Sequence, residues 1–213
     1  MMIRKRQMIY ILLGFSLFMV GIWIVKIING ELPLLDQWSR SFVVQMENTS
    51  IYTFFRIMTE FGSRPFILPF TIGVALLLMG VNRDWLPSLV FAGGTLLSHF
   101  LNNVIKFLVQ RERPTILVEA NAEGFSFPSG HAMTSMVCYG LLSYFIVKKI
   151  KSAKIAFGVQ FFFALLIFLI GISRYVINVH YLTDVAAGFL FGFLLFYGLI
   201  QLYEYVNRLR SPS

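Results

Sequence analysis

Three short clusters of polar residues carry the groups that could do chemistry in this chain, and each falls at the end of an apolar stretch of membrane length. They are Lys106 and Arg113, then Ser129, Gly130 and His131, and finally Arg174, His180 and Asp184. Together they contain three cations, two imidazoles and one carboxylate. This set is suited to binding a phosphate group, attacking it and releasing an alcohol.

The three cations match the first need of phosphate chemistry. A phosphate ester spreads negative charge over its outer oxygens in the transition state, and positive groups stabilise that charge. Lys106, Arg113 and Arg174 would supply it, and arginine adds planar paired donors that fit phosphate geometry. The segment 128–131 predicts a turn into a helix N-terminus, where Ser129 caps the helix and Gly130 lets free N–H groups approach an anion.

The two histidines would divide the remaining chemistry. On the expected helix, His180 and Asp184 are four residues apart and therefore share a face. A carboxylate on one ring nitrogen fixes the tautomer and leaves the other nitrogen free as a nucleophile. Attack on phosphorus would give a phosphohistidine, with His131 as the acid that protonates the leaving alkoxide. Water would then hydrolyse the phosphoenzyme, with His131 acting in reverse as a base.

Each of these residues also has a plainer explanation. The cations could be anchors at the membrane interface, and the histidines could form hydrogen bonds within a helix bundle. Their joint placement at three junctions favours a functional site, because ionisable residues near membrane depth are costly and usually functional.

Two His and one Asp could also bind zinc, but three nearby cations oppose a dication. We therefore expect a metal-free site without a cofactor. His99, Asn102 and Asn103 share a helix face with Lys106, where support of the site and plain packing remain equal alternatives.

Composition predicts an integral membrane protein. Of the 213 residues, 57% are hydrophobic and only 13% are charged, which is unusual for a soluble domain. Apolar blocks of about 20 residues can cross a bilayer as helices. We expect one all-α domain, residues 1–213, built as a bundle of six transmembrane helices. The expected spans are Met8–Ile28, Phe66–Gly80, Trp85–Val109, His131–Val147, Ile155–Ile172 and Tyr181–Tyr203. The short second span could extend back through Ile51–Gly62 as a tilted or kinked helix.

The basic residues predict the orientation of the bundle. Ten of them fall in the segments that alternate spans would place inside the cell, against only Asp84 and Glu204 as acids. These segments account for the whole net charge of +8, so both termini are expected in the cytoplasm. The same bias explains the basic composition without nucleic acid. All three polar clusters then lie on the extracytoplasmic side of a multi-pass protein of the cell membrane.

Two further segments have a predicted structural role. The segment Leu34–Glu47 predicts an amphipathic helix in the outer interface, either a lid over the site or, as we favour, an anchoring connector. Gly188 and Gly192 form a spacing of small residues in the last span. It would either drive dimerisation or, as we favour, let helices of one bundle pack closely. The sequence leaves the oligomeric state open.

The three clusters resemble the signature of the type 2 phosphatidic acid phosphatase family. That signature is Lys-x6-Arg-Pro, Pro-Ser-Gly-His and Ser-Arg-x5-His-x3-Asp, and every position is filled here between Lys106 and Asp184. The resemblance implies a metal-independent phosphatase that vanadate inhibits. It implies His180 as nucleophile, Asp184 as its orienting partner and His131 as general acid. The implied phosphate-binding residues are Lys106, Arg113, Ser129, Gly130 and Arg174.

The resemblance also implies a lipid substrate that reaches the site from the bilayer. On the resemblance to compact bacterial members of the family, we expect this chain to hydrolyse phosphatidylglycerophosphate to phosphatidylglycerol. Hydrolysis of undecaprenyl pyrophosphate, the cell-wall lipid carrier, stays open as an alternative. A lipid-phosphate carrier or flippase is an alternative of another class. Glu119 and Glu123 lie in the loop between the first two clusters, either selecting the headgroup or, more simply, facing water.

Overall fold

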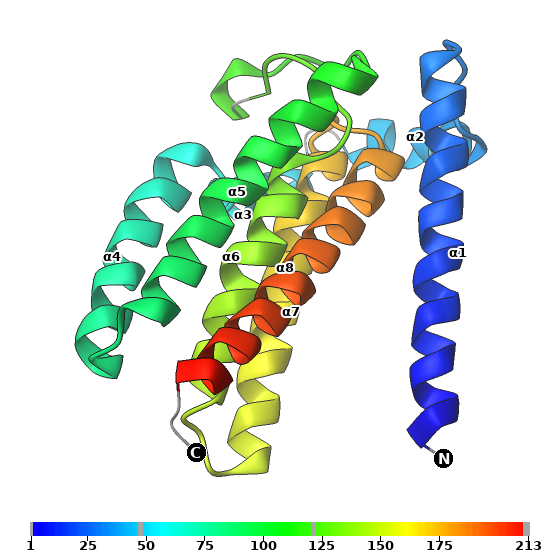
Figure 1. Cartoon of the computed structure of the whole chain (residues 1–213). Coiled ribbons are helices and arrows are strands. Elements are labelled where there is room, and N and C mark those ends of the chain that lie inside the picture. Colours follow the sequence, from blue (N-terminus) through cyan, green and yellow to red (C-terminus); the bar gives the residue numbers. More distant parts are fainter. Residues whose placement is uncertain (1, 47–48, 121, 211–213) are drawn as a thin grey trace.

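The computed structural model describes residues 2–46, 49–120 and 122–210 and consists, over these ranges, of helices joined by loops, the longest of which connects α5 to α6 (Figure 1). No strand occurs among the described residues. The helices are α1 (Met2–Ile28), α2 (Leu34–Met46), α3 (Ser50–Glu60), α4 (Arg64–Asn82), α5 (Trp85–Val109), the 3₁₀ turn η1 (Val118–Ala120), α6 (Gly130–Val147), α7 (Ala153–Val176) and α8 (Leu182–Arg210).

Six of these helices are long and apolar enough to cross a membrane, as the sequence predicts. They are α1, α4, α5, α6, α7 and α8. The expected bounds of α5 are correct, whereas α7 and α8 each extend further than expected. The backward extension of the second span is wrong. Residues 50–60 form the separate helix α3, and a turn at residues 61–63 divides it from α4.

Helix α6 lies at the centre of the bundle. It packs against α5, α7 and α8, and more of its apolar stretch is buried than that of any other spanning helix. In contrast, α1 is the least buried span and stands beside the bundle in Figure 1. Aliphatic and aromatic side chains fill the space around α6, among them Phe91, Leu141 and Ile170, which are fully buried.

Two glycines of α8 allow it to approach α6 closely. A Cβ atom on Gly188 would lie 2.6 Å from the carbonyl oxygen of Ser129, and one on Gly192 would lie 2.7 Å from that of Met133. Both distances are shorter than real contacts of a Cβ atom, and the opposing atoms are backbone. The small-residue spacing therefore serves packing within the bundle, as favoured from the sequence. It also brings the N-terminal ends of α6 and α8 together.

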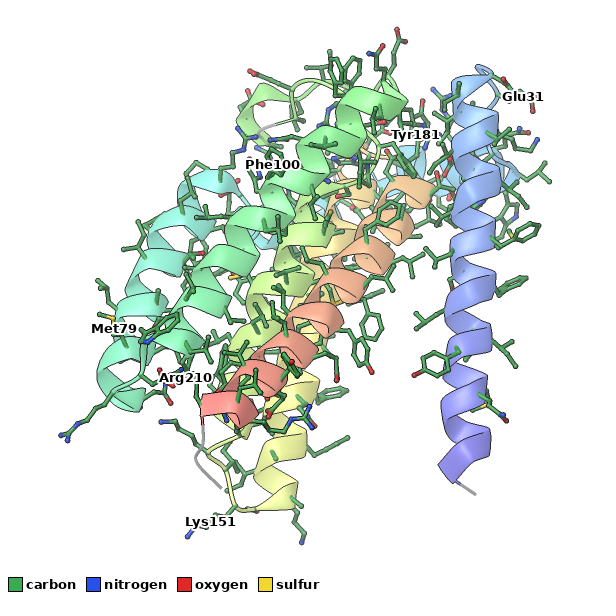
Figure 2. The ribbon with its side chains drawn as sticks, in the orientation of Figure 1. Glu31, Met79, Phe100, Lys151, Tyr181 and Arg210 are labelled. Carbon is green, nitrogen blue, oxygen red and sulfur yellow. The ribbon has the colours of Figure 1, made fainter. Side chains whose placement is uncertain are left out.

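The two ends of the bundle differ in charge. The first turn of α1 and the last turn of α8 lie at the same end, opposite the loop that precedes α6 (Figure 1). Lys151 and Arg210 project from this end, and Glu31 and Tyr181 lie at the other (Figure 2). Two ion pairs also occur at the end that carries Lys151 and Arg210. Arg210 pairs with Asp84 at 2.9 Å, and Lys148 pairs with Glu204 at 2.8 Å.

Helix α2 is amphipathic, but two of its buried residues are polar. Leu34 and Trp38 are 75% and 69% exposed, and Trp38 packs edge to face on Phe42. Asp36 and Ser39 are buried instead, because α2 packs against α7 and α8. The carbonyl of Ser39 accepts a hydrogen bond from the hydroxyl of Tyr175 on α7 at 2.5 Å. Glu47, the last residue of the expected amphipathic segment, lies outside the described residues.

Candidate active site

The three polar clusters meet in one cavity of about 300 Å³, at the end of the bundle where α5 ends and α6 and α8 begin. Most of the sequence-predicted site residues line it. They are Lys106, Arg113, Gly130, His131, Arg174 and His180. The other two, Ser129 and Asp184, are fully buried directly behind this lining. The cationic and imidazole part of the cavity, made by Lys106, Arg113, His131, Arg174 and His180, is called the catalytic cup below.

The first cluster is positioned by the end of α5 and the loop that follows. Helix α5 stops at Gln110, whose φ of 52° turns the chain back. Lys106, in the last turn, donates through Nζ to the carbonyl oxygen of Phe125 at 2.8 Å. Arg113 donates through Nε to the carbonyl of Gly124 at 2.9 Å and through Nη2 to that of Glu123 at 3.0 Å. The loop carbonyls thus hold both cations at the rim of the cavity.

The second cluster forms the expected turn into a helix N-terminus. Ser129 is the N-cap of α6, and its hydroxyl accepts from the N–H of Ala132 at 3.4 Å. A Cβ atom on Gly130 would lie 3.0 Å from the Asn102 amide oxygen, which shows how closely the backbone approaches α5 here. The same amide donates through Nδ2 to the carbonyl of Pro128 at 3.1 Å. Asn102 therefore supports the site rather than merely filling space between helices.

Two side chains of the cup have buried donor or acceptor atoms without a partner among the described residues. Arg174 is fully buried at the end of α7, where its Nη1 donates to the hydroxyl of Thr59 at 2.8 Å. Its Nε and Nη2 have no hydrogen-bond partner, and neither has Nε2 of His131. Leaving buried polar atoms unpaired costs about 1–3 kcal/mol each, and more for charged groups. Such atoms, clustered at a cavity, are expected to bind a ligand with several oxygens.

His180 contacts Asp184 by a different route from the one predicted. Helix α8 begins at Leu182, so His180 lies in the turn before it and the shared helix face does not exist. The turn nevertheless places Nδ1 of His180 3.3 Å from Oδ2 of Asp184. On the other side of the ring, Nη1 of Arg113 lies 2.9 Å from Nε2. Because guanidinium only donates, Nε2 must accept and the proton must lie on Nδ1. The Nε2 lone pair therefore points to the cup side of the ring, where it accepts from Arg113.

The electrostatics of the cup keep this imidazole neutral. Burial lowers the pKa of His180 well below its usual value, and the nearby charges of Arg113 and Lys106 lower it further. Burial lowers the pKa of Arg113 to about 10, so its guanidinium is still charged at neutral pH. No group of three or more His, Cys, Asp or Glu side chains placed to hold a metal ion occurs in the described part of the chain.

A buried ion network behind the cup was missed in the sequence. Arg111 is 6% exposed and donates to Oδ1 of Asp184 at 2.6 Å and to Oδ2 of Asp36 at 2.7 Å. The hydroxyl of Thr183 joins the same network, donating to Oδ2 of Asp36 at 2.6 Å. The guanidinium carbon of Arg111 also lies 3.8 Å from the ring centre of Tyr181. In the sequence, this network was signalled only by an arginine between Lys106 and Arg113 and by the acidic residue Asp36 in the expected amphipathic segment.

Comparison with known proteins identifies the family. The model of the PAP2 superfamily matches residues 87–208, which include all three clusters. The chain belongs to the PAP2 superfamily. It is 34% identical over 161 residues to phosphatidylglycerophosphatase B of Bacillus subtilis (strain 168), covering 72% of this chain and 76% of that protein. This confirms the family predicted from the three clusters.

A solved structure extends the PAP2 likeness to the whole bundle. It is the crystal structure described as the first transmembrane PAP2 type phosphatidylglycerolphosphate phosphatase from Bacillus subtilis. The match has a TM-score of 0.77 and 26% sequence identity, over 91% of this chain and 98% of the other. With its six apolar helices, this chain is a multi-pass, PAP2-type membrane phosphatase that resembles phosphatidylglycerophosphatase B.

Proposed function

We propose that this PAP2 chain hydrolyses the terminal phosphate monoester of phosphatidylglycerophosphate to give phosphatidylglycerol, through a phosphohistidine and without a metal ion. The observation that carries the proposal is the set of buried, unpartnered atoms in the cup, Nε and Nη2 of Arg174 and Nε2 of His131. Both residues line the same cavity as His180. The name of the Bacillus subtilis relative supports the choice of lipid.

The chemistry follows from the positions of the two histidines, with His180 starting neutral and His131 starting protonated. Nε2 of His180 attacks phosphorus while the bond from phosphorus to the ester oxygen breaks, and His131 gives its proton to the departing alkoxide. Asp184 stabilises the positive charge that develops on the His180 ring. Water then attacks the phosphohistidine, its proton passes to His131, and the phosphorus–nitrogen bond breaks. Both histidines are thereby restored. Lys106, Arg113 and Arg174 neutralise the phosphate oxygens throughout, which is the role a metal would otherwise have.

Phosphate release by the purified protein tests this function. We expect release from phosphatidylglycerophosphate that chelator does not reduce and that orthovanadate inhibits. His180→Ala should abolish release while the protein still elutes as a folded species in detergent. An acid-labile phosphoryl group should be trapped on the unmodified protein and be absent from that variant. Loss of activity with chelator, or normal turnover by His180→Ala, would contradict the proposed mechanism.

We further infer that the catalytic cup faces the extracytoplasmic side. The basic segments 83, 148–154 and 208–210 lie at the opposite end of the bundle, and basic loops favour the cytoplasm. Single cysteines at Ile116 and Lys151, both exposed positions, test this in intact cells in a background lacking Cys138. A membrane-impermeant thiol reagent should label Ile116→Cys and not Lys151→Cys. The reverse pattern would place the cup in the cytoplasm.

A further inference from the structure

The cavity extends beyond the catalytic cup into a cleft between α4 and α5. Its lining continues along α5 from Lys106 through Asn103 and His99 to Leu96, at the spacing of one face of a helix. On the facing side α4 contributes Arg64 and Leu68 from its first turns. None of these cleft residues other than Lys106 has a role in the proposed reaction.

The cleft changes character with depth. Arg64 and Asn103, beside the cup, are polar and exposed, and His99 lies between them and the apolar part. The amide nitrogen of Asn103 and Nε2 of His99 are 3.5 Å apart, so the two side chains lie side by side. Leu68 and Leu96, further from the cup, are 48% and 54% exposed. A polar upper part and an apolar lower part, both open to the side, fit a lipid whose head lies in the cup.

Arg64 brings a fourth positive charge to this cavity. It lines the cavity and has no ion pair or hydrogen bond to any described residue. Arginine presents planar paired donors that fit phosphate oxygens. Its position outside the cup, beside two further polar side chains, is suited to a second anionic group on the same lipid.

The spacing along α5 indicates which second anion fits. Asn103 and His99 lie three and seven residues before Lys106, which is about 4.5 and about 10.5 Å along a helix axis. The second phosphate of a diphosphate shares an oxygen with the first and would remain inside the cup. In phosphatidylglycerophosphate a three-carbon glycerol separates the two phosphates. Its inner phosphodiester therefore reaches the level of Asn103 and His99.

We propose that Arg64, His99 and Asn103 form a second anion subsite, which binds the phosphodiester of a lipid whose terminal phosphate monoester lies in the catalytic cup. The subsite rests on the proposed function, because it is defined relative to a phosphate held there. It selects a bis-phosphorylated glycerolipid over phosphatidic acid, which has no second anion. It also explains why α4 begins with a cation beside the cavity rather than with an apolar residue.

The test compares Arg64→Gln with the unmodified protein on phosphatidylglycerophosphate and on phosphatidic acid with the same acyl chains. Losing one charge-assisted hydrogen bond at a partly exposed position should lower kcat/KM for phosphatidylglycerophosphate about 10-fold, mainly through KM. The ratio of kcat/KM between the two lipids should fall by a similar factor. Arg64→Lys keeps the charge and should restore much of this ratio. Arg40→Gln, an exposed arginine on α2 outside the cavity, is the matched control.

A second measurement uses phosphatidylglycerol, which keeps the phosphodiester but lacks the monoester. It should inhibit hydrolysis of phosphatidic acid competitively, and Arg64→Gln should raise its inhibition constant about 10-fold. Equal losses on both lipids, or an unchanged ratio and an unchanged inhibition constant, would overturn the subsite. Failure of the unmodified protein to hydrolyse either lipid would overturn the proposed function and the subsite with it.

Discussion

Arg111 donates to Oδ1 of Asp184 at 2.6 Å, while Oδ2 of the same carboxylate lies 3.3 Å from Nδ1 of His180. The two oxygens of one buried carboxylate are thus divided between a cation and the imidazole. On its other side, Arg111 contacts Asp36 of α2 at 2.7 Å. Helix α2 is therefore connected to the candidate nucleophile, His180, through two buried ion pairs. A helix that only joined its neighbours along the surface would not make such contacts.

Replacing Arg111 with alanine tests the strength of this network. The change leaves Asp36 and Asp184, 2% and 0% exposed, without their shared cation. Removing one partner of a buried ion pair typically costs about 3–5 kcal/mol, so the free energy of unfolding should fall by that order. Thermal unfolding in detergent measures it, with the exposed Arg40→Ala as control. Equal melting temperatures for the two variants would show that the network contributes little.

The pH profile should report the charge around His180. Protonation of Nε2 blocks attack, and burial with nearby cations lowers the pKa of this group. The acid limb of kcat/KM should therefore lie below pH ~6.5, the ordinary histidine value. Arg113→Gln removes the cation with the largest effect on His180, so the His180 pKa should rise and the acid limb should move to higher pH. The substrate phosphate titrates identically in both measurements, so only the shift between proteins counts. An unmoved limb would contradict the assignment.

The sequence predicted the spanning helices well because their signal is local. Long apolar runs must form helices in lipid, whatever they pack against. The division between α3 and α4 was missed, although Ser63 followed by Pro65 is typical of a helix start. The packing of this turn, in contrast, is not local. A Cβ atom on Gly62 would lie 2.5 Å from Ile170 and 2.8 Å from the ring of His131.

The site was predictable only where its residues follow a fixed spacing along the chain. The spacing of the three clusters named eight residues, and the structure brings all eight to one cavity or its wall. Arg111 pairs with Asp36, which is 75 residues away on another helix. Arg64 belongs to a helix whose start was misplaced. Neither the contact of Arg111 with Asp36 nor the position of Arg64 at the cavity follows from helical periodicity, because each depends on how the helices pack.

The role of His131 as general acid predicts a dependence on the leaving group. An alkoxide of glycerol needs a proton to leave, whereas p-nitrophenolate leaves without one. In the first turnover, His131→Gln should therefore slow release of the lipid alcohol by about 100-fold or more and release of p-nitrophenol much less. A burst of p-nitrophenol equal to the enzyme concentration should follow, because the base for the second step is also missing. Equal slowing of both substrates would assign His131 to phosphate binding instead.

Gly188 and Gly198, both on α8, lie in different surroundings and allow a matched test of helix packing. A Cβ atom on Gly188 would lie 2.6 Å from the carbonyl oxygen of Ser129, whereas one on Gly198 would have no atom within 4 Å. Gly188→Ala must push α8 away from the first turn of α6, at a cost of about 1–3 kcal/mol. Gly198→Ala should instead gain up to about 1 kcal/mol from helix propensity. Because Ser129 precedes His131, and its N–H donates to the carbonyl of Asp184 at 2.9 Å, only Gly188→Ala should also lower kcat. Equal melting temperatures and equal kcat for the two variants would mean that the close approach of α6 and α8 does not hold the cup together.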